Sequence, residues 1–339
     1  MKTMRTAGAA MALLAGLSVP LVARADAVAD FYRGKTINML IGIGAGGEYD
    51  LLARTIAKYI VRYIPGNPTS VSQNMTGAGG LKMTNFLFNQ APRDGTYMAV
   101  IQSGLPAAQV MNVPGISFDI ARFNWLGTIQ PAVETLVMWH TTGVKTIADA
   151  TKREYSVGAS SRGSNTYAMP ALMNAFFGTR FKIVTGYTGG NLINLAMERG
   201  EVDGRVNSWA SWKTTKGAWL KEKKIVVIAQ AGPKVADLDA PSLEHLAKSD
   251  DDRKIIELVL SGSHFGRPIT TTPGVPPERL AALRTAFNAV MKDKDFLAEM
   301  AAKNYDVAPI TGEQLQRTAE KLVATPRALA ERAKKILGR

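Results

Sequence analysis

The residues of this chain best suited to chemistry are the glycines and acids of Gly42-Ile-Gly-Ala-Gly-Gly-Glu-Tyr-Asp50, which lie at the end of an apolar run over 36–43 and directly after it. Glycines at the start of a helix leave backbone N–H groups uncovered, and the positive end of the helix dipole lies at the same place. This turn therefore predicts a cradle for a small anion.

The same glycines, Gly42 to Gly47, formally satisfy the dinucleotide-binding fingerprint G-x-G-x-x-G. An NAD site also requires an acid about twenty residues further on, at the end of the second strand. Here that predicted strand ends in Val71-Ser-Gln-Asn-Met75, without an acid. The N-terminus also lacks a twin-arginine signal, which would export a protein already folded around its cofactor. We therefore predict neither a dinucleotide nor any other cofactor.

Metal binding and nucleophilic catalysis find little support in the sequence. The histidines His140, His245 and His264 are far apart and lack the ligand spacing of a zinc site, and cysteine is absent. Ser160 or Ser161 could act as a nucleophile, but neither lies in a G-x-S-x-G motif. We predict no metal and no enzyme, with an exported hydrolase as the alternative class.

Small polar loops recur where a predicted strand meets a predicted helix. Any one of them could be an ordinary strand-to-helix turn, but there are two in each half of the chain. Open sheets bind ligands beyond the carboxyl ends of their strands, so the set predicts one cleft between two domains. The four loops are 44–50, 76–80, 160–166 and 187–191.

Alternating strand and helix patterns place these loops. In the first half, extended runs over 36–43, 70–75 and 96–102 alternate with helical spacing over 52–63 and 81–89. Such alternation predicts a mainly parallel sheet covered by helices. After Phe123 the pattern changes to two adjacent extended runs, 124–129 and 133–139, which we interpret as the passage into a second domain.

The second half repeats the alternation and ends in helices. The extended runs are 155–160, 181–187, 202–207 and 225–230. Helical patterns cover 165–177, a segment opened by Pro276-Pro277, 293–303 and the chain from Thr311 onward. The predicted fold class is α/β, with two domains and a ligand cleft between them.

The N-terminus predicts export. Lys2 and Arg5 precede an apolar run over 7–22 and then Ala23-Arg-Ala25, which is typical of a secretory signal peptide cleaved after Ala25, or alternatively after Ala27. Removing residues 1–25 takes away three basic residues and no acid, so the formal net charge falls from +13 to +10. The basic residues are scattered, which favours a solubility role over an anion-attracting field, and no nucleic-acid motif is present.

At its glycine loops the chain resembles the extracytoplasmic solute receptors of tripartite tricarboxylate transporters, the Bug family. The similarity extends over nearly all of the predicted mature chain. It is carried by Ile43-Gly-Ala-Gly-Gly-Glu-Tyr-Asp-Leu-Leu-Ala-Arg54, Gln73-Asn-Met-Thr-Gly-Ala-Gly-Gly80, Ala91-Pro-Arg-Asp-Gly95, Tyr187-Thr-Gly-Gly190, Arg199-Gly-Glu-Val-Asp-Gly204 and Pro273-Gly-Val-Pro-Pro277.

The resemblance implies a type II periplasmic-binding-protein fold that closes on one organic acid and delivers it to membrane permease subunits. It implies that backbone amides of the first loop hold the ligand carboxylate, partly through water. The implied ligand-binding residues are Gly46, Gly47, Glu48 and Asp50 of the first loop, Gly77, Ala78 and Gly79 of the second, and Ser160, Ser161, Ser164, Asn165, Gly189 and Asn207 of the other domain.

Two features depart from the family pattern. Glu48 occupies a position that is usually small or neutral, where a carboxylate would repel a second carboxylate unless it faced solvent or met a cationic ligand group; we favour a role as a first-turn acid of the helix. Four aromatic residues lie on or near the predicted rim, which leads to the hypothesis of a bulkier, aromatic or long-chain ligand, with core packing of the tryptophans as the competing explanation. They are Tyr49, Tyr187, Trp209 and Trp212.

Together these patterns predict a monomeric periplasmic receptor. We expect a signal peptide over 1–25, a first domain formed by 26–128 with 232–339, and a second domain formed by 129–231. A sensory binding subunit is the remaining alternative to transport.

Overall fold

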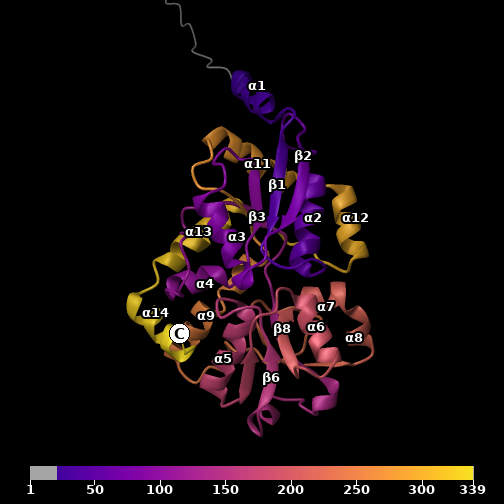
Figure 1. Ribbon diagram of the computed structural model, residues 1–339, viewed down its shortest axis with the longest axis vertical. Coiled ribbons are helices and arrows are strands. Elements are labelled where there is room, and N and C mark those ends of the chain that lie inside the picture. The colour runs from indigo at the N-terminus through magenta and orange to yellow at the C-terminus, as the bar shows by residue number, and fades with distance from the viewer. Residues whose placement is uncertain (1–20, 339) are drawn as a thin grey trace, which may run out of the picture.

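A computed structural model describes residues 21–338, and the strands within them form two sheets that lie one above the other in Figure 1. Most of the predicted signal peptide, residues 1–20, lies outside the described residues. The first sheet has the order β11-β4-β10-β3-β1-β2 and the second β7-β6-β8-β5-β9. The strands of the first are β1 Thr36–Ile41, β2 Thr69–Asn74, β3 Tyr97–Val100, β4 Asn124–Thr128, β10 Ile269–Thr271 and β11 Ile310–Thr311. Those of the second are β5 Glu134–Trp139, β6 Tyr155–Gly158, β7 Phe181–Val184, β8 Gly204–Ser208 and β9 Ile225–Ala231.

Both sheets are mixed, so the prediction of a mainly parallel sheet is wrong. In the first sheet β1 pairs in parallel with β2 and β3, but β10 runs antiparallel between β3 and β4. In the second, β6 pairs in parallel with β7 and β8, whereas β5 is antiparallel to β8 and β9. Two of the antiparallel strands, β5 and β10, are the ones by which the chain enters a sheet after crossing from the other.

Helices cover the faces of both sheets. α2 packs against β1, β2 and α11, and the buried side chains of its inner face include Leu52 and Ile56. The longer helices are α1 Leu21–Tyr32, α2 Glu48–Ile60, α3 Leu81–Asn89, α5 Asn165–Phe177, α6 Gly190–Glu198, α9 Asp250–Val259, α11 Pro277–Val290, α12 Lys294–Ala302, α13 Gly312–Val323 and α14 Arg327–Ile336. The shorter ones are α4 Leu105–Val110, α7 Trp209–Thr215, α8 Gly217–Lys221 and α10 Gly262–Phe265.

The chain crosses between the sheets twice, over 129–133 and over 232–268. The two crossings are tied together, because the N–H of Ala132 donates to the carbonyl of Ser263 and the N–H of Arg267 donates to Oγ1 of Thr128. The second crossing carries α9, which packs against α5 and against α14 beside the junction of the two sheets (Figure 1). Glu134 directly follows the first crossing, and Arg267 lies at the end of the second.

The N-terminal helix α1 begins before the predicted cleavage sites, and its buried residues lie after them in the sequence. Val28 and Tyr32 of α1 are buried, and the hydroxyl of Tyr32 donates to the carbonyl of Gly95. Both cleavage positions would leave these two residues in the chain. Within residues 21–338, none of the helices combines the length and the apolar character needed to cross a membrane.

Candidate functional site

A cavity of about 120 Å³ lies between the two sheets. An apolar cavity of about 150 Å³ is large enough to hold benzene, so this one is sized for a short ligand. Its walls come from 46–49, 102–103, 165–166, 189–191 and 205–207, with Glu134, Ser160 and Arg267 among the further lining residues.

Three helices begin at this cavity. Glu48 opens α2, Asn165 opens α5 and Gly190 opens α6, and all three residues line the cavity. The first four N–H groups of a helix have no partner within it, and the dipole adds positive potential at that end. The arrangement is therefore suited to an anion.

Asp50 braces the first glycine loop from within. Its carboxylate accepts the N–H of Gly46 at 3.1 Å and is held by Arg54 and by Asn74, which also donates to the carbonyl of Ile43. Asp50 does not line the cavity. These contacts indicate that Asp50 fixes the conformation of the loop. The sequence around Asp50 did not predict this role.

Glu48 is buried and ion-paired. One carboxylate oxygen accepts Nε of Arg267 at 2.9 Å and the hydroxyl of Ser208 at 2.8 Å, and the other accepts the hydroxyl of Tyr305 at 3.1 Å. Glu48 does lie in the first turn of α2, as interpreted from the sequence, but complementing the helix dipole is not its whole role, because its carboxylate is bound to a cation from a segment 219 residues away.

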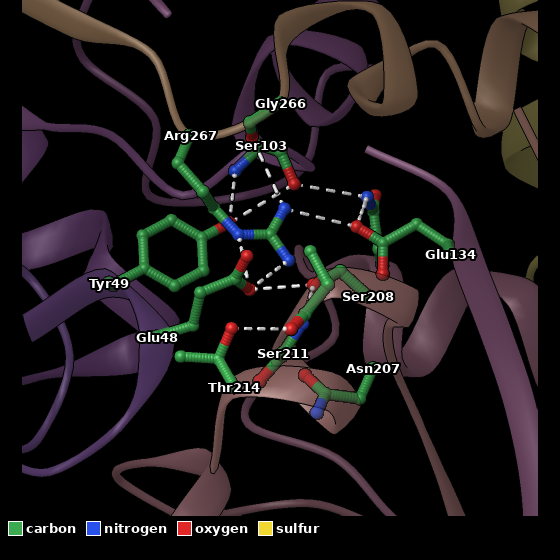
Figure 2. Close-up of polar contacts among 12 residues, drawn as sticks. Glu48, Tyr49, Ser103, Glu134, Asn207, Ser208, Ser211, Thr214, Gly266 and Arg267 are labelled. Atoms are coloured by element: carbon green, nitrogen blue, oxygen red, sulfur yellow. Dashed lines mark hydrogen bonds and ion pairs between the residues drawn. The ribbon is translucent and has the colours of Figure 1, made fainter. Parts of the chain in front are cut away.

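Arg267 joins two carboxylates. Its guanidinium also reaches Oε1 of Glu134 at 3.2 Å, and it lies over the ring of Tyr49 at 4.6 Å. Figure 2 shows Glu48, Glu134 and Tyr49 gathered around it. Burial alone would lower the pKa of Arg267, but the neighbouring charges, Glu48 first, raise it well above its usual value. We call Glu48, Arg267 and Glu134 the buried ion triad.

Tyr49 lines the cavity and is fixed at its hydroxyl, so the prediction that it belongs to the wall agrees with its position. The hydroxyl donates to Oγ of Ser103 and accepts the N–H of Ser103, and Nδ2 of Asn165 donates to the same Oγ. Burial raises the pKa of Tyr49, opposed by the charge of Arg267. This chain of bonds joins the starts of α2 and α5.

The predicted site residues divide into two groups. Those that line the cavity are Gly46, Gly47, Glu48, Tyr49, Ser160, Asn165, Gly189 and Asn207. Those placed outside its lining are Asp50, Gly77, Ala78, Gly79, Ser161, Ser164, Tyr187 and Trp209. Ser164, for example, uses its hydroxyl within its own loop, on the carbonyl of Ser161.

The aromatic-wall hypothesis needs correction. Trp212 is fully buried, packs near Trp219 and donates its indole N–H to Oγ1 of Thr135, so it belongs to the core. Of the four aromatic residues only Tyr49 is in the lining, and the cavity is small. The observed cavity therefore does not suit the bulky ligand that the rim aromatics suggested.

Sequence reasoning missed Glu134, Arg205, Ser103 and Arg267, all of which line the cavity. Glu134 opens a strand and Arg267 precedes the three-residue strand β10, too short for a periodic pattern. A usable signal for Arg205 was present, since a charged residue inside an otherwise buried strand requires a partner.

The two sides of the cleft also touch at its rim. The N–H of Gly44 donates to the carbonyl of Thr188 at 2.8 Å, and Nδ2 of Asn191 donates to the carbonyl of Ala45 at 3.0 Å. A Cβ atom built on Gly79 would overlap Oγ of Ser161. We call these three pairs the rim contacts.

The three histidines and the serines considered as nucleophiles can be placed in the described part of the chain. Among residues 21–338 no group of three or more histidine, cysteine or acidic side chains is placed to hold a metal. His140, His245 and His264 are exposed, and none of them lines the cavity. Within residues 21–338, the hydroxyl of Ser160 hydrogen-bonds only to the hydroxyl of Thr166.

Solved structures resemble this one over nearly the whole chain. The periplasmic binding protein BugD matches with a TM-score of 0.70 and 18% identity, covering 90% of this chain and 98% of its own. MatC from Rhodopseudomonas palustris with bound malate matches with a TM-score of 0.69 and 18% identity, covering 89% and 99%. Rpa4515 from R. palustris with adipate matches with a TM-score of 0.69 and 19% identity, covering 90% and 97%.

No protein-family model and no curated protein sequence matches the chain. The structural matches confirm the predicted fold: two α/β domains of the type II periplasmic-binding-protein class, with a cavity between them.

Proposed function

We propose that this protein is a periplasmic solute receptor of the tripartite tricarboxylate transporter, or Bug, family, and that it captures a small organic acid. The observation that carries the proposal is the convergence of three helix N-termini on one cavity between the two sheets. The similarity in fold to BugD, MatC and Rpa4515, two of which are described with a bound carboxylic acid, supports it.

Binding without turnover accounts best for the cavity. Its polar groups are helix N-termini, amides, hydroxyls and ion pairs, and the exposed histidines are elsewhere. A general base within hydrogen-bond reach of a nucleophile is the usual sign of hydrolysis. In residues 21–338 neither Ser160 nor Ser161 has a recorded bond of that kind, which favours a receptor over the exported hydrolase.

Delivery to membrane permease subunits, a periplasmic location and a monomeric state complete the proposal. The proposed domains are 26–128 with 232–339 and 129–231, and the division of the strands between two sheets supports them. The segment 250–259 contacts helices on both sides of the boundary, so the second crossing would act as part of the hinge.

A thermal-shift screen tests the proposal. Protein purified from the periplasm of an expressing bacterium should be stabilised by at least one short carboxylic acid, with the acid recovered unchanged. At a hundredfold excess over its dissociation constant, a ligand bound only by the native state adds about 2.7 kcal/mol to the free energy of unfolding. Stabilisation by neutral or cationic compounds alone would contradict it, as would accumulation in the cytoplasm.

A further inference from the structure

Three cationic side chains line the cavity, and two of them already have carboxylate partners. Arg267 is held between Glu48 and Glu134 in the buried ion triad. Lys216 pairs with Glu198 at 3.4 Å. Neither is free to neutralise a ligand without giving up an existing partner.

Arg205 is the third, and its partners are all uncharged. Nε donates to the carbonyl of Val206, and Nη1 donates to the carbonyl of Gly190 and to Oδ1 of Asn194. Among the described residues, no carboxylate lies within ion-pairing distance of Arg205, and its Nη2 makes no hydrogen bond. The side chain lines the cavity from β8 and lies over the ring of Trp212 at 5.5 Å.

A buried cation without an anion is costly, so the surroundings of Arg205 point to a missing partner. Only 4% of the residue is exposed. Burial lowers its pKa to about 10, although Glu134 and Glu48 act in the opposite direction. Carbonyl oxygens and an aromatic face relieve part of the desolvation, and a carboxylate would relieve most of it.

The charges of the cavity wall also limit the ligand. The net formal charge of the wall is zero: Glu48 and Glu134, both bound to Arg267, carry as many charges as Arg267 and Arg205 together, and Lys216 is paired with Glu198. A monocarboxylate brings one negative charge, which the starts of three helices can stabilise. A dicarboxylate would bring two, and the second would lie near the two glutamates without a cation of its own.

We propose that Arg205 forms the ion pair with the ligand carboxylate, and that the cavity therefore selects a short monocarboxylate over a dicarboxylate of equal length. This inference rests on the proposed function and makes it more specific. Trp212, which the sequence offered as part of a ligand wall, would support Arg205 from the core side instead.

Calorimetric titration of the wild-type protein tests the selectivity. The probes are butyrate against succinate and 3-hydroxybutyrate against malate, two pairs of equal carbon number. The monocarboxylate of at least one pair should bind about tenfold more tightly, because a second buried charge lacks a partner. Equal or tighter binding of both dicarboxylates overturns the selectivity and leaves the proposed function standing, whereas the proposed function itself is contradicted only if no short carboxylic acid stabilises the protein in the thermal-shift screen.

Substitutions test the residue. Arg205→Gln should weaken the best-binding monocarboxylate at least about thirtyfold, since one partner of a buried charge pair is removed. Arg332→Gln, the same change at a surface arginine that is not in the cavity lining, is the control and should change the affinity less than about threefold, because Arg332 pairs with Asp251 away from the cavity.

Folding is checked by urea unfolding without ligand. A folded Arg205→Gln protein that binds as tightly as the wild type overturns the assignment. If Arg205→Gln does not fold, Arg205→Lys tests the assignment instead, because lysine keeps the positive charge. The affinity of this variant for the monocarboxylate should stay within about tenfold of the wild type. A folded Arg205→Lys protein that binds none of the wild-type ligands overturns the assignment as well.

Discussion

Glu48 opens α2, where a carboxylate ordinarily complements the helix dipole, yet its oxygens are bound by Arg267, Ser208 and Tyr305. Glu48, Glu134 and Arg267 are 5%, 3% and 4% exposed, so the buried ion triad is shielded from water. Pairs of this kind add little net stability, but removing one member leaves an uncompensated buried charge. The triad is therefore sensitive to single substitutions.

Replacing Arg267 with methionine should lower the free energy of unfolding by about 3–5 kcal/mol, because two buried carboxylates lose their common cation. Urea unfolding at neutral pH measures the change. Arg332→Ala is the control, since Arg332 is half-exposed and pairs with Asp251 on the surface, and it should cost less than about 1 kcal/mol. Equal losses in the two variants would show that the triad is not energetically distinct.

At this scale the sequence allowed only part of the site to be predicted. The first loop could be found because glycine and helix-start chemistry is local, and 46–49 do line the cavity. The partner of Glu48 could not, because Arg267 is brought to it by the second crossing and by the pairing of β10. Nothing within the local sequence around Glu48 carries that information.

Among the elements, α2 connects the cavity to the outer helices. Its first turn lines the cavity, and further along Lys58 and Tyr59 bond to Glu299 of α12 at 2.7 and 2.9 Å. Lys303, which directly follows α12, also bonds to Glu299 at 2.9 Å. These bonds, Lys58 first, lower the pKa of Glu299 from 4.5 to about 2.

That lowered pKa gives the stability a defined pH dependence. A carboxyl group with a lowered pKa in the folded state stabilises the fold above its ordinary value of 4.5, and the contribution is lost as the pH falls from there toward 2. Glu299→Gln should therefore reduce the free energy of unfolding by about 1 kcal/mol at pH 7, and the difference from wild type should shrink below pH 4.5.

Thermal unfolding over a pH series checks this expectation. Asp30→Asn, which removes an exposed carboxylate bonded to Arg33, is the control and should leave the melting temperature nearly unchanged at every pH. A constant difference between Glu299→Gln and wild type from pH 7 to pH 3 would count against the ionic role of Glu299.

Most elements were predictable because their patterns are long and regular. Strands β1 to β9 and helices α2, α3, α5 and α11 to α14 lie within or close to the predicted ranges. The strand β10 was not predicted, because it has only three residues, Ile269-Thr-Thr271, and its burial comes from β3 and β4 on either side. Missing it also hid the mixed character of the first sheet.

For the molecule as a whole, the question is how the two sheets part to admit a ligand. The rim contacts join loops of the first sheet's side to loops of the second, through Gly44 with Thr188, Ala45 with Asn191 and Gly79 with Ser161. We expect them to form when the domains close, because hinge closure around a ligand brings loops of two domains together.

Gly79→Ala tests this expectation. A Cβ atom at Gly79 would overlap Oγ of Ser161, so the closed state should be disfavoured and the affinity for the organic acid should fall about tenfold or more. The matched control is Gly34→Ala: Gly34 has φ +70, close to the +65 of Gly79, but nothing lies within 4 Å of its Cβ position. Both variants carry similar backbone strain, and only the first should lose affinity.

Calorimetric titration with the acid found in the thermal-shift screen gives the two affinities. Equal affinities in Gly79→Ala and Gly34→Ala would mean that approach of Gly79 to Ser161 is not needed for binding. A loss in both would point to backbone strain transmitted through the fold.

The position of Arg267 and Glu134 at the two crossings has a mechanical consequence. In a rotation about the crossings, the displacement of an atom grows with its distance from the axis. Glu134 directly follows one crossing and Arg267 lies at the end of the other, so a turn that separates the rim would move their charges little relative to each other. The domains could therefore open while Arg267 and Glu134 stay paired near the rotation axis. Opening would mainly break the neutral hydrogen bonds of the rim contacts, which lie farther from that axis.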